Sequence, residues 1–79
     1  MSNSLLRLPA VVERTGLSRA SVYLHVHKGV MTPPVKIGDR SAAWPEAEID
    51  AINAARIAGK SELEIQVLVG SLQRQRSAA

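Results

Sequence analysis

The sequence predicts a mainly α-helical protein that carries one small β-hairpin, and three observations lead to this fold class. A glycine corner at Gly16 separates two helical segments. Residues 35–44 alternate apolar and polar side chains around a Gly-Asp turn signal, which is typical of a hairpin. Two further helix starts follow, at Pro45 and Ser61. With 79 residues, the chain has room for one small domain with a modest core.

The first two helices are expected over residues 9–15 and 19–28. Pro9 suits the first turn of a helix, because its missing N–H would have no partner there. Gly16 supplies the left-handed conformation that ends the first helix, and Ser18 can cap the second by accepting a backbone hydrogen bond. This order of residues is that of a helix-turn-helix.

The core side of this half of the chain is aliphatic. Leu5, Leu6 and Leu8 are expected to form an extended lead-in that places leucines on the core. In the first helix Val12 should be buried, with Leu8 or Val11 beside it. In the second helix the core face should carry Val22, His25 and Val26.

The opposite face of the second helix carries Ala20, Leu24 and His27, which is unusual for a helix that faces only water. Such a face suits the major groove of DNA, where small apolar groups meet thymine methyls. Arg19, in the first turn, is placed either for a guanine edge or for a phosphate. The candidate DNA-binding residues are Ser18, Arg19, Ala20, Ser21, Tyr23, Leu24, His27 and Lys28, with Lys36 and Arg40 from the hairpin.

The hairpin directly after the second helix is expected to act as a wing. Its tip would carry Lys36, Asp39 and Arg40, and the two basic side chains would meet phosphate or the minor groove. Two strands alone are marginally stable, so Trp44 must pin the hairpin to the helices. The expected fold is therefore a winged helix-turn-helix with an added C-terminal helix.

Charge is unevenly distributed along the chain. Residues 1–45 carry six basic and two acidic side chains, whereas residues 46–64 carry two basic and five acidic ones. This favours one face toward a polyanion and another away from it, with ordinary surface charge as the alternative. There is no cysteine, no signal peptide and no apolar run of about 20 residues, so a cytoplasmic protein without a membrane span is expected.

The C-terminal part should contain two helices. The third would begin at Pro45, bury Ile49, Ile52 and Ile57, and stop at Gly59. The fourth would run over residues 62–74, with a frayed end because a glycine lies inside it. We expect residues 1–60 to form the winged domain and residues 61–79 a C-terminal helix.

The fourth helix is apolar over more than one face. Its candidate self-association residues are Ile65, Leu68, Val69 and Leu72, and packing of these side chains back on their own domain is the alternative. Self-association would give a homodimer or a DNA-nucleated array. A protein–protein adaptor that works through this helix is a rival function.

Catalytic and metal sites are not expected. His25 and His27 point to different sides of a helix, and no nearby cysteine or carboxylate completes a ligand set. Glu46, Glu48 and Asp50 are explained by the positive end of a helix dipole. No enzyme, metal or cofactor is therefore predicted.

The chain resembles the AlpA family of small phage and mobile-element regulators, relatives of excisionases and MerR-type winged helices. The resemblance covers about residues 5–75. It rests on Arg7-Leu-Pro9, Thr15-Gly-Leu-Ser-Arg19, Ser21-Val-Tyr23, Pro34-Val-Lys-Ile-Gly38, Arg40, Trp44, Glu48-Ile-Asp50 and Ala55-Arg-Ile-Ala-Gly-Lys60.

This resemblance implies a non-enzymatic protein that binds double-stranded DNA. It would regulate transcription of a prophage or mobile element, with RNA polymerase as a partner, or act as an excisionase that bends DNA for an integrase. Arg19, Ser21 and Tyr23 would contact DNA, and Arg40 would lie on the wing. Many relatives have a basic residue directly after the tyrosine; Leu24 occupies that position here, so one candidate base contact is missing.

Overall fold

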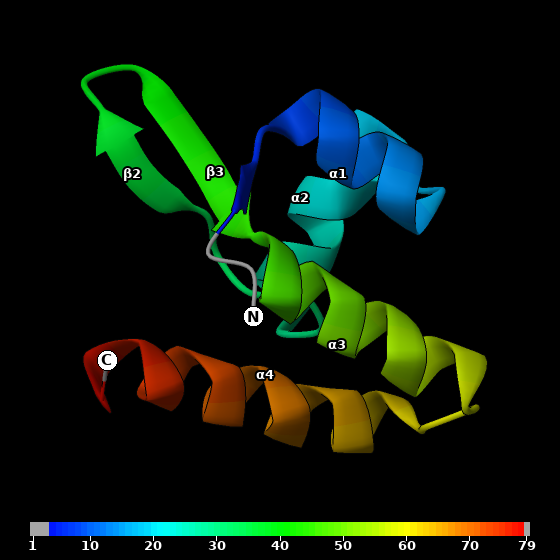
Figure 1. Ribbon diagram of the computed structural model, residues 1–79. Coiled ribbons are helices and arrows are strands. Elements are labelled where there is room, and N and C mark those ends of the chain that lie inside the picture. The colour runs from blue at the N-terminus through cyan, green and yellow to red at the C-terminus, as the bar shows by residue number, and fades with distance from the viewer. Residues whose placement is uncertain (1–3, 79) are drawn as a thin grey trace.

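The computed structural model describes residues 4–78, which fold into four helices and three short strands (Figure 1). In chain order these are β1 (Leu5–Leu6), α1 (Leu8–Thr15), α2 (Arg19–Lys28), β2 (Val35–Gly38), β3 (Ser41–Pro45), α3 (Glu46–Ile57) and α4 (Glu62–Ala78). The predicted class, mainly α with a β-hairpin wing, is confirmed. Within residues 4–78 no helix combines the length and apolar character that a bilayer crossing needs.

The helix-turn-helix has nearly the predicted bounds. α1 begins at Leu8, one residue early, because the carbonyl of Arg7 already accepts the first helical N–H bonds. It ends at Gly16, whose φ of 74° is the left-handed conformation, and the Gly16 N–H donates to the Val12 carbonyl over 2.9 Å. α2 has the predicted bounds, and the Ser18 side chain caps its start.

The sheet has one more strand than the predicted hairpin. Its order is β1-β3-β2 and both seams are antiparallel. Leu5 lies opposite Pro45 and Leu6 lies opposite Trp44, so the expected extended lead-in is a third strand. Two consecutive leucines gave no alternation from which a paired strand could be predicted.

The turn of the wing lies one residue later than the Gly-Asp signal indicated. Gly38 is the last residue of β2 and pairs with Ser41, so the two turn residues are Asp39 and Arg40. The register shifts between Lys36 and Gly38, which leaves one extra residue in β2. Such a bulge increases the local twist of the strand.

Trp44 fixes the wing to the helices, as predicted. Its side chain is buried, and its indole N–H donates to the Thr32 carbonyl over 2.7 Å. Its ring also meets that of Tyr23 on α2, with centroids 6.2 Å apart and planes tilted by 58°. α2 and the wing therefore share one aromatic contact.

α3 and α4 form a hairpin whose helices run side by side (Figure 1). The predicted capping box starts α4: the Ser61 N–H donates to the Glu64 carboxylate and the Glu64 N–H to the Ser61 hydroxyl. The helix continues to Ala78, past the frayed end expected near Arg74.

An ion pair explains why α4 continues. Arg76 donates through Nε to Glu48 Oε2 over 2.8 Å and through Nη2 to Glu48 Oε1 over 2.6 Å. The same Nη2 donates to the Pro33 carbonyl over 2.8 Å. Glu48 is buried as well as lying in the first turn of α3. The helix dipole therefore explains only part of its stabilisation, and the hydrogen bonds from Arg76 supply the rest.

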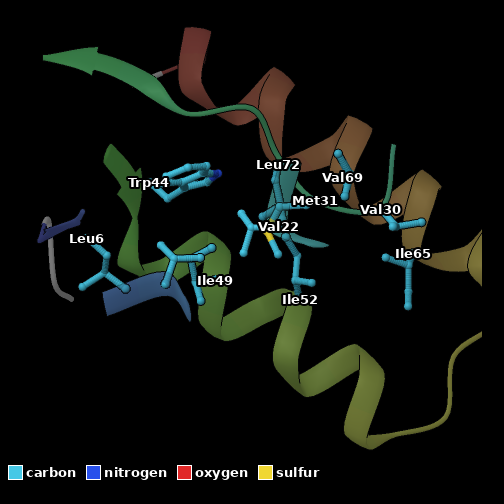
Figure 2. Packing of buried hydrophobic residues seen from close by; sticks show 11 residues of the cluster. Leu6, Val22, Val30, Met31, Trp44, Ile49, Ile52, Ile65, Val69 and Leu72 are labelled. Carbon is cyan, nitrogen blue, oxygen red and sulfur yellow. The ribbon is translucent and has the colours of Figure 1, made fainter. Parts of the chain in front are cut away.

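All the helices contribute to one hydrophobic core (Figure 2). Its buried members are Leu6, Val11, Val22, Val30, Met31, Trp44, Ile49, Ile52, Ile65, Val69 and Leu72. In α1 the fully buried residue is Val11, and Val12 is half-buried. The expected burial of Ile57 is wrong: it is 87% exposed, because it lies about 140° around α3 from Ile52.

The apolar residues of α4 divide between the core and the surface. Ile65, Val69 and Leu72 are buried against the chain's own domain, so three of the four candidate self-association residues are not at the surface, and Leu68 is half-buried. The exposed apolar side chains of α4 are Leu63 and Val67. The alternative of packing back on the domain accounts for the wide apolar face.

Candidate nucleic-acid interface

α2 presents a continuous exposed face on the side away from the core. Val22 is fully buried and Val26 half-buried, whereas the candidates Arg19, Ala20, Tyr23, Leu24, His27 and Lys28 are all exposed. Because 100° separates successive residues, Arg19 and Lys28 lie on opposite edges of this face, about 180° apart. Leu24 and Ala20 lie between them, where a groove-facing helix presents small apolar groups.

The hydroxyl groups at the start of α2 are already used in the cap. Ser18 Oγ accepts from the Ser21 N–H over 3.1 Å and donates to Ser21 Oγ over 2.9 Å. Ser21 is half-buried, and its own hydroxyl proton remains to donate. Ser18 and Ser21 therefore set the position of the first turn of α2, which carries Arg19.

Three arginines surround one hollow between α2 and the wing. This arginine hollow has a volume of about 440 Å³ and carries Arg19 from α2, Arg40 from the wing turn and Arg7 from the start of α1. Tyr23 and Trp44 also line it, and no acidic residue does. A phosphate oxygen placed here would meet guanidinium groups from three separate elements.

Arg7 was missing from the candidates, although it lies in the hollow. It precedes α1 by one residue and lies twelve positions before Arg19, so helical spacing does not connect the two. The pairing of β1 with β3 brings the start of α1 beside the wing. The only signal in the sequence was its place in the Arg7-Leu-Pro9 motif of the resemblance.

The two lysines among the candidates lie in different places. Lys36 is exposed and is paired with Ala42, which lines the arginine hollow. Paired residues of neighbouring strands project to the same face, so Lys36 extends this basic surface by one strand. Lys28 instead contacts Glu62 of α4 over 3.3 Å, and the structure does not bring it to the hollow.

Salt bridges divide the basic residues of the described chain into two groups. Arg14 reaches Glu46 over 2.8 Å and Asp50 over 3.6 Å, which ties the end of α1 to α3. Lys28 and Arg76 are paired as described above. Within residues 4–78, none of the four basic residues on the wing side forms a salt bridge: Arg7, Arg19, Lys36 and Arg40.

Metal chemistry has no candidate site in the part of the chain that the structure describes. Residues 4–78 contain no group of three histidine, cysteine or carboxylate side chains close enough to hold an ion. His25 contacts Arg56, and Glu46 and Glu48 contact arginines. The carboxylates thus have structural partners.

The fold and this surface define a winged helix-turn-helix protein with one unpaired basic face. Residues 4–57 match the family described as "Prophage CP4-57 regulatory protein (AlpA)", and the chain belongs to this family, as its motifs indicated. The matched segment ends with α3, so α4 lies outside it.

Two relatives are similar over more than half of the chain. The chain is 42% identical over 55 residues to the "Uncharacterized protein ORF88" of Enterobacteria phage P4, covering 70% of this chain and 62% of the phage protein. It is 42% identical over 52 residues to the "DNA-binding transcriptional activator AlpA" of Escherichia coli (strain K12), covering 58% of this chain and 74% of that protein. The chain thus spans less than two thirds of the phage relative. No solved structure matches it significantly.

Proposed function

We propose that this protein is a non-enzymatic transcription regulator that binds double-stranded DNA sequence-specifically. The main observation in support is that Arg7, Arg19 and Arg40 line one hollow, and that no acidic side chain lines it. α2 would enter the major groove with Arg19 near its leading end, and the wing would follow the adjoining backbone or minor groove. The similarity to the E. coli protein named as a DNA-binding transcriptional activator supports this function.

The residues would divide between base reading and phosphate binding. Arg19 has the position for a bidentate contact with guanine, and Ala20 and Leu24 for thymine methyls. Tyr23, His27, Arg40 and Lys36 would contact phosphates and set the register. Lys28 is held by Glu62 at the far edge of α2 and would contribute less than the other basic candidates.

Fluorescence anisotropy with duplex fragments from beside the gene tests this proposal. Arg19→Ala should lose about 1–3 kcal/mol of discrimination between specific and unrelated duplexes. Arg40→Ala should weaken binding to all duplexes and lower the slope of log affinity against log salt by about 1. Arg74→Ala, which changes an exposed arginine on α4, is the matched control and should bind like the wild type. No binding of the wild type to any duplex at low salt would refute the proposal.

An excisionase-like use of the same surface is the second candidate. Basic side chains on both α2 and the wing would favour bent DNA, because bending lets more of the protein reach the backbone. Energy transfer between dyes on the two ends of a bound duplex measures the bend. An unbent complex that recruits RNA polymerase would favour the regulator, and a bent complex that stimulates an integrase would favour the excisionase.

Self-association is proposed through a surface that shares only Leu68 with the candidates expected from the sequence. Ala55, Leu63, Val67 and Leu68 line an apolar groove of about 490 Å³ between α3 and α4, with Lys60 and Glu64 beside it. Lys60 and Glu64 carry opposite charges, so a two-fold axis through the groove would pair each with the other in a second copy. A homodimer formed this way would leave the arginine hollow of both copies free for DNA.

Sedimentation analysis across a concentration series tests the homodimer. Val67→Ser should shift the equilibrium toward monomer, whereas Ile37→Ser, which removes an exposed apolar side chain from the wing, should not. A monomer at every concentration, without and with DNA, would exclude both the homodimer and a protein–protein adaptor that pairs with itself.

A further inference from the structure

A second hollow lies where the ends of α2 and α3 meet the start of α4, and the proposed DNA contacts do not use it. This junction cleft has a volume of about 430 Å³. Its polar lining consists of His25, Lys28, Arg56, Lys60 and Glu62, over an apolar floor. Apart from Lys28, none of these residues is a proposed DNA contact.

Arg56 is the unusual residue of the junction cleft. Its side chain is half-buried, and within residues 4–78 its only hydrogen-bond partner is the His25 ring, with Nη2 2.8 Å from Nδ1. Its Nε atom is buried and has no partner. The half-buried Arg76, in contrast, has both oxygens of a carboxylate. Arg56 is thus a half-buried cation without an anion, an arrangement that is unfavourable unless charge is supplied from outside the chain.

His25 is neutral in the cleft and can still take up a proton. The Arg56 guanidinium can only donate, so the Nδ1 atom of His25 must accept, and the ring is neutral in this arrangement. Burial lowers the pKa of His25, and the charges of Arg56 and Lys28 lower it further, while Glu62 opposes them. Protonation of the ring is therefore less favourable than in a free histidine, and an anion bound in the cleft would make it more favourable.

The net charge of the cleft is positive even with His25 neutral. The pair formed by Lys28 and Glu62 at 3.3 Å cancels one cation and accounts for the single acidic side chain. Arg56 and Lys60 remain without a salt-bridge partner among the described residues. Two cations without a salt bridge, beside a titratable imidazole, are an arrangement that suits a small, doubly charged oxyanion.

We propose that the junction cleft binds a small phosphate- or sulfate-class anion, held by Arg56 and Lys60 and assisted by His25. Arg56 donates to the anion from its fixed fork, and Lys60 supplies a mobile ammonium at the rim. The anion connects α2, α3 and the start of α4, so its binding stabilises the folded chain. The ligand is a free small anion, and DNA phosphate is the competing source.

NMR titration of the full chain with sodium sulfate, against sodium chloride at equal ionic strength, tests the proposal. Sulfate should shift the amide signals of Lys28, Arg56 and Lys60 saturably. Lys60→Gln, a change at an exposed residue, should weaken sulfate binding by about five- to tenfold without unfolding the chain. Arg56→Gln should abolish saturation, and Lys36→Gln, on the wing, is the control that should leave it unchanged. Inorganic phosphate should give the same pattern as sulfate.

The pH dependence separates the role of His25 from that of the permanent cations. The charge of sulfate is constant over this range, so its affinity should rise between about pH 8 and about pH 5.5 as Nδ1 of His25 takes up a proton. The protonated Nδ1 no longer accepts from Arg56 Nη2, which is then free to donate to the anion. His25→Gln should remove that rise. A rise that persists in His25→Gln would show that the ring does not assist the anion.

Three other results would overturn the proposal. Amide shifts that do not saturate with sulfate, or that match those caused by chloride, would show general screening. Saturable shifts at Arg19 and Arg40 alone would place the anion in the arginine hollow. If Lys60→Gln weakens duplex binding and leaves the sulfate titration unchanged, the phosphate recognised by the cleft belongs to DNA.

Discussion

The wing side of the molecule and its α3–α4 side both carry arginines, and the two groups have different surroundings. Arg14 and Arg76 each meet carboxylates of α3, at distances from 2.6 to 3.6 Å, and join elements far apart in the chain. Arg7, Arg19 and Arg40 form no salt bridge with any described residue and line a hollow. The partners of an arginine, more than its position in the sequence, therefore distinguish a stabilising role from a binding role.

The largest expected effect is a loss of folding stability when an arginine with a carboxylate partner is removed. Arg76→Ala leaves the buried Glu48 carboxylate without its partner, which should lower the free energy of unfolding by about 2–4 kcal/mol. Urea denaturation measures the loss. The double variant Glu48→Gln with Arg76→Ala should be more stable than Arg76→Ala alone, because no buried charge remains. Equal stability of the two variants would show that the charge of Glu48 contributes nothing to the loss.

The next effect concerns the unpaired side and the residue that sequence spacing missed. Arg7→Ala should lower DNA affinity by up to about tenfold at low salt, because one phosphate contact is lost. Its free energy of unfolding should change by less than about 0.5 kcal/mol, since Arg7 is exposed and forms no salt bridge. Anisotropy and urea denaturation on the same preparation separate these two quantities. A variant that loses stability and keeps its affinity would move Arg7 to the structural group.

Removal of either of two helix caps should have a smaller effect on stability, and only one of the two caps lies on the wing side. Ser18→Ala and Ser61→Ala each remove an N-terminal capping hydroxyl, and each should cost about 1 kcal/mol of folding stability. Only Ser18→Ala should also weaken DNA binding, because it loosens the turn that carries Arg19. Thermal unfolding and anisotropy of both variants test this. A similar loss of affinity in Ser61→Ala would mean that α4 contributes to the DNA surface.

The smallest expected effect is the pH dependence of stability from His25. Its pKa in the folded chain lies below the ordinary value, chiefly because of burial, so the folded chain binds the proton less readily than the unfolded chain. The stability is therefore complete above about pH 6.5 and falls as the pH drops toward the lowered pKa. The urea midpoint of wild type should decrease over that range more than that of His25→Gln. The exposed His27→Gln should follow the wild type.

Local sequence signals predicted the helices and the exposed face of α2 well. Proline, glycine and serine at helix ends act through adjacent backbone groups, so the bounds of α2 and the capping box of α4 could be predicted from a few neighbouring residues. The exposure of Ala20 and Leu24 followed from helical periodicity in the same way.

Features that depend on distant parts of the chain could not be predicted this way. The third strand needs Pro45 and Trp44 opposite Leu5 and Leu6, and nothing local to two leucines indicates that pairing. The length of α4 depends on an ion pair across 28 residues. The wide apolar face of α4 was compatible with two partners, and the structure shows that most of it packs on the chain's own core.

The two seams of the sheet also differ in the loops that must close to form them. The β2–β3 seam closes over only the two turn residues Asp39 and Arg40, so its loop-closure entropy is small. Local contacts of this kind form early in folding. The β1–β3 seam joins Leu5 to Pro45, so the intervening helices must first be close to their final places. Because Arg7 follows β1 directly, the arginine hollow is completed only by this late, long-range step.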